Sequence, residues 1–324
     1  MTSISVVIPC YCSADWLEDL TNEIITNLSN SQDDFEIILV DDCSPDGGRT
    51  YNKIVELSEK LESVIGIRLQ FNVGQFRALL CGLEESKGRI VVTMDDDLQH
   101  PPNQIMDLVE PLFCNPDIDC VIGRYKVKSH NILRNLGSKL VGRILQKLHN
   151  KPRGIKTTSF RAMRRTLVDS IIGHKTARPV MGALVLKSTN RIMNVEVEHR
   201  KRPHGESGWG IRPMFSATMD LVFNSTTWPL RSLWYAGFII AFASILAAGK
   251  ITLEYMNGEI NEPGYASIFI LIVFFGGLQL LGIGMIGEYV DRIISEVQGS
   301  PRWVISERTD AESTNRIQNL QSRD

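Results

Sequence analysis

Residues 90–102 read IVVTMDDDLQHPP, so a short apolar run ends abruptly in three adjacent carboxylates. The run Ile90–Met94 is apolar on both faces, which is typical of a strand buried inside a sheet. Asp95, Asp96 and Asp97 follow at once, where their like charges repel one another. A solvated acidic turn before the two prolines is one interpretation of this cluster, and a cation-binding strand end is the other.

A divalent cation would relieve the repulsion, because Mg²⁺ is typically held by one or two carboxylates together with substrate phosphates. Side chains alternate along an extended chain, so Asp95 and Asp97 are expected on one side of it. Gln99 lies one step further along and would offer a neutral oxygen. The pattern therefore predicts a metal site formed by Asp95, Asp97 and Gln99.

The first 125 residues repeat this pattern, since short apolar runs alternate with amphipathic stretches. The runs predict strands over Ser3–Pro9, Phe35–Val40, Ile65–Leu69, Ile90–Met94 and Cys120–Gly123. The stretches between them predict helices near Ala14–Leu28, Arg49–Leu61, Gln75–Glu85 and Asn103–Phe113. The alternation predicts an α/β domain whose open, mostly parallel sheet is flanked by helices. Ligands of such sheets bind beyond the carboxyl ends of the strands.

A second acidic pair, Asp41 and Asp42, follows the strand Phe35–Val40 and precedes Cys43-Ser44-Pro45-Asp46-Gly47. Taken alone, the pair is better explained by a helix cap and a turn, which Asp and Ser favour. Two acidic clusters at strand ends of one sheet instead favour a binding site, where carboxylates accept hydrogen bonds from a base or a ribose.

The charge is distributed unevenly, although the net charge is only −2. Residues 121–168 contain thirteen Lys or Arg and no Asp or Glu, which points to an anionic partner. Nucleic acid, a membrane surface and phosphorylated substrates are all compatible with that stretch alone. Within it, Asn131–His149 has apolar residues at helical spacing among four cations, which predicts an amphipathic helix in the membrane interface rather than a core-facing one.

Two uncharged stretches change the class of protein that the sequence predicts. Leu233–Gly249 has seventeen residues without a charge and Tyr265–Gly287 has twenty-three. A bilayer needs about twenty apolar residues as helix, so the stretches predict a transmembrane hairpin rather than two buried core helices. Nucleic-acid binding is then not expected. The loop between the stretches has Glu254, Glu259 and Glu262 but no cation after Lys250, so it is expected outside the cytoplasm.

The remaining composition adds little. The six cysteines have no paired spacing, so neither a zinc site nor a disulfide framework is expected. Ile4–Pro9 begins directly as a strand, and no signal peptide is expected. The predicted parts are residues 1–128 as the α/β core, 129–228 as a region with the amphipathic interfacial helix, 229–294 as hairpin and 295–324 as cytoplasmic tail.

The motifs and their order resemble glycosyltransferase family 2. They are VVIPCY at 6–11, VDDCSPD at 40–46, NVGQ at 72–75, MDDDLQHPP at 94–102, Arg134 with Ser138, RPHGES at 202–207, GEY at 287–289 and the stretch 297–304 after the second span. Within the family, the sequence resembles the dolichyl- and undecaprenyl-phosphate sugar transferases with a two-helix C-terminal hairpin. The resemblance covers nearly all of the chain to about residue 305.

The resemblance implies a GT-A fold, with residues 1–128 as the nucleotide-sugar-binding core and residues 129–228 as the acceptor-side region. It also implies a role for particular residues. Pro9, Tyr11 and Asp41, with Asp42 and Asp96 beside them, correspond to positions that hold the nucleotide. Asp95, Asp97 and Gln99 correspond to the ligands of Mg²⁺ or Mn²⁺. Arg124, Arg134 and Ser138 correspond to positions that receive the lipid phosphate, and Arg202 and Ser207 to a mobile acceptor loop. The catalytic set is then Asp95, Asp97, Arg124, Arg134 and Arg202.

The implied reaction is inverting transfer from a nucleotide-sugar, with UDP favoured over GDP, to a polyprenyl phosphate. The implied location is a bacterial inner membrane, as a homo-oligomer with both termini cytoplasmic. Two departures from the family pattern weaken details: Cys12-Ser13 replace the usual Asn-Glu, and Gly208-Trp209 replace a usual Lys and aromatic, a loss that Arg200 or Lys201 would offset. The alternatives are a transferase to another lipid or a polysaccharide, and an anchored binding protein without turnover.

Overall fold

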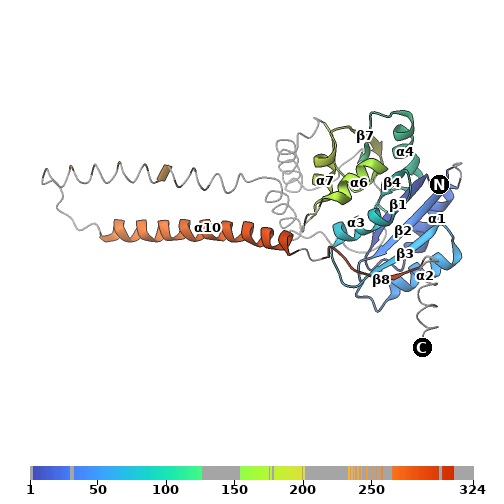
Figure 1. The fold of residues 1–324 in the computed structure, drawn as a ribbon, viewed down its shortest axis with the longest axis horizontal. Coiled ribbons are helices and arrows are strands. Elements are labelled where there is room, and N and C mark those ends of the chain that lie inside the picture. Colours follow the sequence, from blue (N-terminus) through green and yellow to red (C-terminus); the bar gives the residue numbers. More distant parts are fainter. Residues whose placement is uncertain are drawn as a thin grey trace. The chain divides into compact units, whose positions relative to one another are not determined.

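The computed structural model of this protein describes residues 3–29, 33–125, 154–174, 176, 179–198, 200, 265–298 and 301–309, with single positions between 233 and 257. The chain divides into two compact units (Figure 1). One unit contains Met1–Thr218 together with Pro301–Asp324, and the other contains Met219–Ser300. The predicted interfacial helix, Arg134, Ser138, Arg202 and Ser207 lie outside the described residues.

The first unit is built from alternating strands and helices. Its elements are β1 (Ile4–Cys10), α1 (Leu17–Leu28), β2 (Phe35–Asp41), α2 (Arg49–Lys60), β3 (Val64–Leu69), α3 (Gln75–Glu85), β4 (Ile90–Thr93), the 3₁₀ turn η1 (Pro102–Gln104), α4 (Ile105–Cys114), β5 (Cys120–Tyr125), β6 (Arg161–Arg164), α6 (Arg165–Gly173), α7 (Met181–Ser188), β7 (Ile192–Val197) and β8 (Ile305–Arg308). The five strands and four helices predicted for the first 125 residues are all present.

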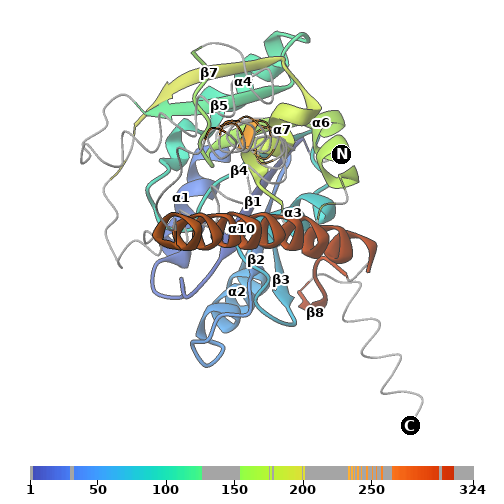
Figure 2. The same cartoon turned by 90° about the vertical axis from the view of Figure 1, so that its left-hand side faces the viewer.

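The strands form one sheet in the order β7-β5-β6-β4-β1-β2-β3-β8 (Figure 2). Parallel pairs join β1 to β2 and β4, β2 to β3, and β5 to β7. However, β6 is antiparallel to β4 and β5, and β8 is antiparallel to β3. The α/β prediction is therefore confirmed, whereas the sheet is mixed because two strands that the sequence did not reveal enter it in the opposite direction.

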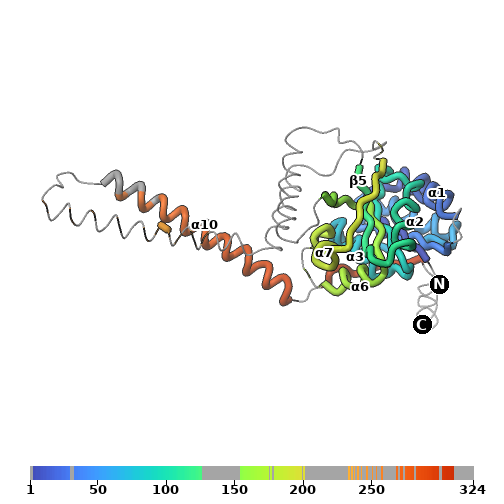
Figure 3. Tube along the Cα trace, turned by 90° about the horizontal axis from the view of Figure 1, so that it is seen from above, coloured from blue at the N-terminus to red at the C-terminus, as the bar shows by residue number. Residues whose placement is uncertain are grey.

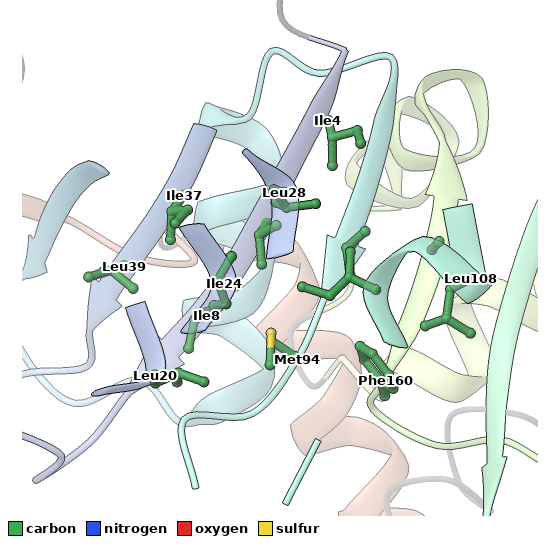
Figure 4. Packing of buried hydrophobic residues seen from close by; sticks show 14 of the residues in the cluster. Ile4, Ile8, Leu20, Ile24, Leu28, Ile37, Leu39, Met94, Leu108 and Phe160 are labelled. Atoms are coloured by element: carbon green, nitrogen blue, oxygen red, sulfur yellow. The ribbon is translucent and has the colours of Figure 1, made fainter. Parts of the chain in front are cut away.

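Helices cover both faces of the sheet, which explains why its central strands are apolar throughout. Side chains of α1, α2 and α4 pack on one face, where Ile8, Ile24 and Leu39 belong to one buried cluster (Figure 4). Side chains of α3, α6 and α7 pack on the other face, where Val7 and Ile38 belong to a second cluster. The traces of these three helices lie next to one another (Figure 3). Adjacent residues of one strand thus enter opposite clusters, as strand alternation requires.

The last strand, β8, closes the edge of the sheet at β3. Gln70 donates its backbone N–H to the carbonyl of Val304 at 2.8 Å, and Thr309 donates to Gly66 at 3.0 Å. Arg68 and Glu307 form an ion pair at 2.9 Å. The predicted tail 295–324 therefore contributes a strand to the catalytic sheet, and an otherwise open edge is covered.

The second unit contains the helix α10 (Tyr265–Val297). Large apolar side chains along it are exposed, among them Ile272, Leu280 and Ile283. A side chain at Gly282 would meet Leu233 at 3.1 Å, so the two positions approach closely. Across the part of the chain that the structure describes, no helix has the length and apolar character required for a membrane crossing. The predicted hairpin stays a prediction.

Candidate active site

Four loops meet at the carboxyl ends of β1, β2 and β4, and hydrogen bonds between distant residues hold them together. The backbone N–H of Tyr11 donates to Asp96 at 3.0 Å, and that of Cys12 donates to the Ser44 hydroxyl at 3.0 Å. The backbone N–H groups of Val73 and Gly74 donate to the two oxygens of Asp42, at 2.7 and 2.9 Å. Both acidic clusters predicted from the sequence therefore lie at one edge of the sheet, as expected for strands that run parallel.

Asp95 is held in place by three partners from other parts of the chain. Gln75 Nε2 donates to Oδ1 at 2.8 Å, and the Ser159 hydroxyl donates to Oδ2 at 2.6 Å. The backbone N–H of Asp95 donates to Nδ1 of His100 at 3.0 Å. The carboxylate is partly buried and has a fixed orientation, as a metal ligand or a charged anchor requires.

His100 has a definite protonation pattern because of that bond. Its Nδ1 accepts from a backbone N–H, so the neutral ring carries its proton on Nε2, which lies 2.9 Å from the Tyr125 hydroxyl. The ring also stacks on Phe160, with centroids 5.1 Å apart. Burial raises the pKa of Tyr125, and the negative charges of Asp95 and Asp97 raise it further. The negative charges of Asp95 and Asp97 thus disfavour ionisation of the Tyr125 hydroxyl.

Asp96 faces the loop that follows β1. Its Oδ2 accepts from the backbone of Tyr11, and its carbonyl accepts from Nε1 of Trp16 at 2.6 Å. Burial raises the pKa of Asp96 to about 7, and the charges of Asp95 and Asp97 add to the shift. Asp96 therefore joins the β1 loop to the acidic strand end.

Asp97 and Gln99 complete the predicted ligand set. Oδ1 of Asp97 accepts from the backbone N–H of Gln99 at 3.1 Å. Gln99 in turn pairs with Arg200, whose backbone N–H donates to the Gln99 carbonyl at 3.1 Å. The guanidinium of Arg200 lies on Glu23 at 2.7 Å. Arg200 is therefore paired with Glu23 here, and its replacing the cation missing from the acceptor loop stays a prediction.

Asp41 and Asp42 differ in what they bind, although both are buried. Asp41 accepts from the Ser44 hydroxyl at 2.5 Å, and Nε of Arg68 lies 3.9 Å from its other oxygen. Asp42 uses both oxygens on the backbone of the 73–74 turn. Burial raises the pKa of Asp42 to about 6 and also raises the pKa of Asp41. Asp42 consequently shapes the loop that presents Gln75 to Asp95.

Backbone strain is concentrated at this edge of the sheet. Cys12, Cys43 and Leu98 have φ of 54°, 51° and 60°, the left-handed region that non-glycine residues rarely adopt. Each follows the end of β1, β2 or β4. Such conformations cost roughly 1–3 kcal/mol each and cluster at functional sites.

A divalent cation fits the chemistry of this strand end. Two carboxylates, Asp95 and Asp97, precede the turn at Leu98 and Gln99 follows it, so this strand end carries oxygen ligands of the kind that Mg²⁺ and Mn²⁺ take. Among the described residues, no group of three or more His, Cys, Asp or Glu side chains is arranged to hold a metal ion. Substrate phosphates would have to complete such a site.

Arg124 lies apart from the carboxylates. It is on β5 opposite Glu196 of β7, and the two form an exposed ion pair. The next residue, Tyr125, carries its hydroxyl to His100, so Arg124 points to the opposite face of the strand. Sequence reasoning missed the supporting residues Gln75, Ser159, His100 and Tyr125. Gln75 and His100 lie inside the quoted motifs, whereas Ser159 has no local pattern that would single it out.

Comparison with known proteins agrees with this arrangement. Residues 5–172 match the glycosyl transferase family 2. The chain belongs to glycosyltransferase family 2. It is similar over most of its length to undecaprenyl-phosphate 4-deoxy-4-formamido-L-arabinose transferases: 31% identical to that of Aeromonas hydrophila subsp. hydrophila (93% of this chain, 92% of the relative) and 30% identical to that of Proteus mirabilis (98% and 97%). The protein is therefore a glycosyltransferase, and its resemblance to the polyprenyl-phosphate branch is confirmed.

Solved structures confirm the fold. Glucosyl-3-phosphoglycerate synthase from Mycobacterium tuberculosis, in complex with Mn²⁺, UDP and glucosyl-3-phosphoglycerate, has a TM-score of 0.50 at 20% identity, over 68% of this chain and 78% of that chain. The complex with UDP alone has a TM-score of 0.51 at the same identity and coverage. The GT-A-like mixed α/β fold is thereby established.

Proposed function

We propose that this glycosyltransferase moves a sugar from a UDP-linked donor to a polyprenyl phosphate such as undecaprenyl phosphate, with inversion at the anomeric carbon. The reaction would take place at the cytoplasmic face of a bacterial inner membrane. The observation that carries the proposal is the similarity to undecaprenyl-phosphate sugar transferases across more than 90% of both chains.

The strand-end cluster supports the donor half of the reaction. Asp95, Asp97 and Gln99 would hold Mg²⁺ or Mn²⁺, which when bound neutralises negative charge on the departing phosphate. Tyr11 is half exposed just after β1 and Asp41 ends β2, and both would contact a base or ribose. Asp42 and Asp96 would hold the loops of that pocket in place.

The acceptor half needs charge and position more than a strong base. A phosphate monoester has its second pKa near 6 and is largely ionised at neutral pH. Its oxygen attacks the anomeric carbon as the bond from that carbon to the β-phosphate oxygen breaks, and a nucleoside diphosphate leaves. Arg134, Ser138, Arg202 and Ser207 would bind the lipid phosphate. Arg124 would join them, since its exposed ion pair with Glu196 is worth only about 0–1 kcal/mol and a phosphate dianion can displace it.

A membrane hairpin would bring this site to its lipid. The uncharged stretches of seventeen and twenty-three residues and the exposed apolar side chains of α10 support it. Connectivity gives independent support: the strands before Met219 and the strand β8 after Ser300 belong to one sheet, so the chain must return to the side that it left. Two crossings satisfy that requirement, and one does not.

The test is transfer of label from a panel of UDP- and GDP-linked sugars to undecaprenyl phosphate in membranes that contain the protein. Label should appear in the extracted lipid for one donor. It should be abolished by EDTA, be restored by Mg²⁺ or Mn²⁺, and be absent in Asp97→Asn. Label that entered lipid only when diacylglycerol was the acceptor would contradict the proposal, and so would nucleotide binding without any transfer.

A further inference from the structure

Arg161 is a buried cation on the otherwise apolar side of β6. Its side chain is only 5% exposed. It is two residues from Met163 and therefore points to the same face, where Met163 packs with Cys120 and Ile122 in the second buried cluster. Charged side chains are rarely buried this deeply unless they are paired.

Two hydrogen-bond donors of Arg161 stay unused among the residues that the structure describes. Within the described part of the chain, its Nε and Nη1 are buried and have no hydrogen-bond partner. Arg164, three residues along the same strand, is the opposite case. Its Nε donates to the Ile118 carbonyl at 2.7 Å and its Nη2 donates to the Asn115 carbonyl at 3.0 Å. The hydrogen bonds of Arg164 give it a structural role in the fold, whereas among the described residues Nε and Nη1 of Arg161 have no such bonds to account for its burial.

The position of Arg161 connects it to the acidic strand end. It pairs in register with Thr93, two residues before Asp95, and Ser159, two residues before Arg161, donates its hydroxyl to Asp95 at 2.6 Å. Burial lowers the pKa of Arg161, and the charge of Asp95 acts in the opposite direction. A guanidinium stays protonated at neutral pH even so.

Asp95 does not neutralise Arg161 by direct pairing. Its two oxygens already accept from Gln75 and Ser159. In the region that the structure covers, no ion pair of 4.0 Å or less joins Arg161 to a carboxylate. Removing a cation from water without a partner is unfavourable, so an arginine left in this state is expected to gain one from a ligand.

We propose that Arg161 binds a phosphate oxygen of a substrate beside the Asp95 strand end. Phosphate is the anion that both the nucleotide-sugar donor and the polyprenyl phosphate acceptor carry, and N–H donors of arginine match its oxygens. This assignment rests on the proposed function for its choice of ligands. It adds Arg161 to the arginines that the sequence motifs indicate.

The test is binding rather than turnover, in the full-length protein with Mn²⁺ present. Affinities for UDP and GDP are measured by calorimetry, with uridine and guanosine as phosphate-free controls, and undecaprenyl phosphate binding is measured in detergent micelles. Arg161→Met should weaken either the nucleoside diphosphate or the lipid phosphate by about ten- to hundredfold, the loss expected for a hydrogen bond to a charged group. The ligand whose affinity falls carries the phosphate that Arg161 binds. Arg161→Lys should lose less.

Stability distinguishes a binding role from a structural one. Because Arg161 is unpaired, Arg161→Met should keep or raise the melting temperature of the ligand-free protein. Arg164→Met, the matched control on the same strand, should lower it and leave all affinities unchanged. Unchanged affinities in Arg161→Met and Arg161→Lys would overturn the proposal, and so would an equal loss for uridine or guanosine. Wild type that binds a nucleoside diphosphate but transfers no sugar would instead refute the proposed function alone.

Discussion

At the scale of single residues, the acidic side chains of the site differ in the kind of hydrogen-bond donor that their oxygens bind. Within the described residues, backbone N–H groups of the 73–74 turn donate to both oxygens of Asp42, whereas the donors to the Asp95 carboxylate are the side chains of Gln75 and Ser159. A side-chain donor can rotate away when a stronger partner arrives, and a backbone donor cannot without moving its loop. Asp95 is therefore able to change partners, and Asp42 is a fixed support.

The buried Asp42 should make stability depend on pH. Its pKa rises from 3.8 to about 6 on folding, so the folded state holds the proton more tightly. The resulting stability is fully present below about pH 4 and is lost as pH rises through 6, at a cost of about 3 kcal/mol. We expect the melting temperature of the wild type to fall between about pH 4 and pH 6, and the fall to be smaller in Asp42→Asn.

Asp46→Asn is the control for this measurement. Asp46 accepts from Gly48 and Thr50 at the start of α2, and hydrogen bonds from Thr50 and Gly48 lower its pKa. Its contribution is thus lost only below the ordinary aspartate range. Asp46→Asn should cost little stability, because Asn caps a helix about as well as Asp, and it should leave the slope between about pH 4 and pH 6 unchanged. An equal slope in wild type and Asp42→Asn would refute the assignment.

The division between donor and acceptor residues is testable at Arg134. Arg134→Ala should weaken the apparent affinity for polyprenyl phosphate by roughly ten- to hundredfold, because it removes a charge-assisted hydrogen bond. Arg134→Lys should restore part of it, since a point charge cannot reproduce the planar fork. The measurements are a lipid-dependence curve for transfer and titration of UDP with Mn²⁺. Loss of UDP binding with normal lipid dependence would contradict the division.

At the scale of elements, α3 reaches the sheet through a glycine. A side chain at Gly82 would overlap Val7 and would lie 3.0 Å from Val40, so α3 packs closely against β1 and β2 at this point. That contact places the start of α3, and with it Gln75, next to Asp95.

Gly82→Ala should therefore destabilise the protein, against the usual trend in helices. Alanine gains up to about 1 kcal/mol of helix propensity over glycine, but overpacking a buried contact costs about 1–3 kcal/mol. The steric term should win. Gly182→Ala in α7 is the matched control, because nothing lies within 4 Å of its added carbon, and it should be neutral or stabilising. Thermal unfolding of both variants measures the difference. Equal changes in melting temperature would show that α3 can move away from the sheet to make room for the added methyl group.

At the scale of the whole molecule, the return of the chain to β8 constrains topology. Glu307 of β8 pairs with Arg68, whose Nε lies 3.9 Å from Asp41, so the last strand supports the predicted nucleotide pocket. If the proposed hairpin crosses a membrane, a strand that belongs to this sheet must lie on the same side of it as the site.

Cysteine labelling in intact cells tests the orientation, in a background without native thiols. Asn257→Cys lies in the acidic loop between the two stretches and should react with a membrane-impermeant reagent. Ser313→Cys lies beyond β8 and should react only after the cells are opened. Labelling of Ser313→Cys in intact cells would overturn the cytoplasmic placement of the tail, and with it the membrane face proposed for the reaction.

The sequence alone determined the parallel centre of the sheet and the position of both acidic clusters. The pattern of Ile90–Thr93 followed by Asp95–Asp97 is local, because burial of a central strand makes it apolar throughout and its carboxyl end must then be polar to meet a ligand. The helices of the first 125 residues were predicted from local periodicity, because burial of one helix face likewise sets a local apolar pattern.

Only the tertiary structure decided which distant residues support these clusters. Ser159 reaches Asp95, and β8 joins β3, through pairings between segments 64 and more than 200 residues apart, which no local pattern encodes. The apolar side of β6 gave no reason to expect a charge, so the burial of Arg161 became visible only once its neighbours were in place. Long-range pairing fixes the environment of a side chain, and that environment determines what an aspartate or an arginine can do.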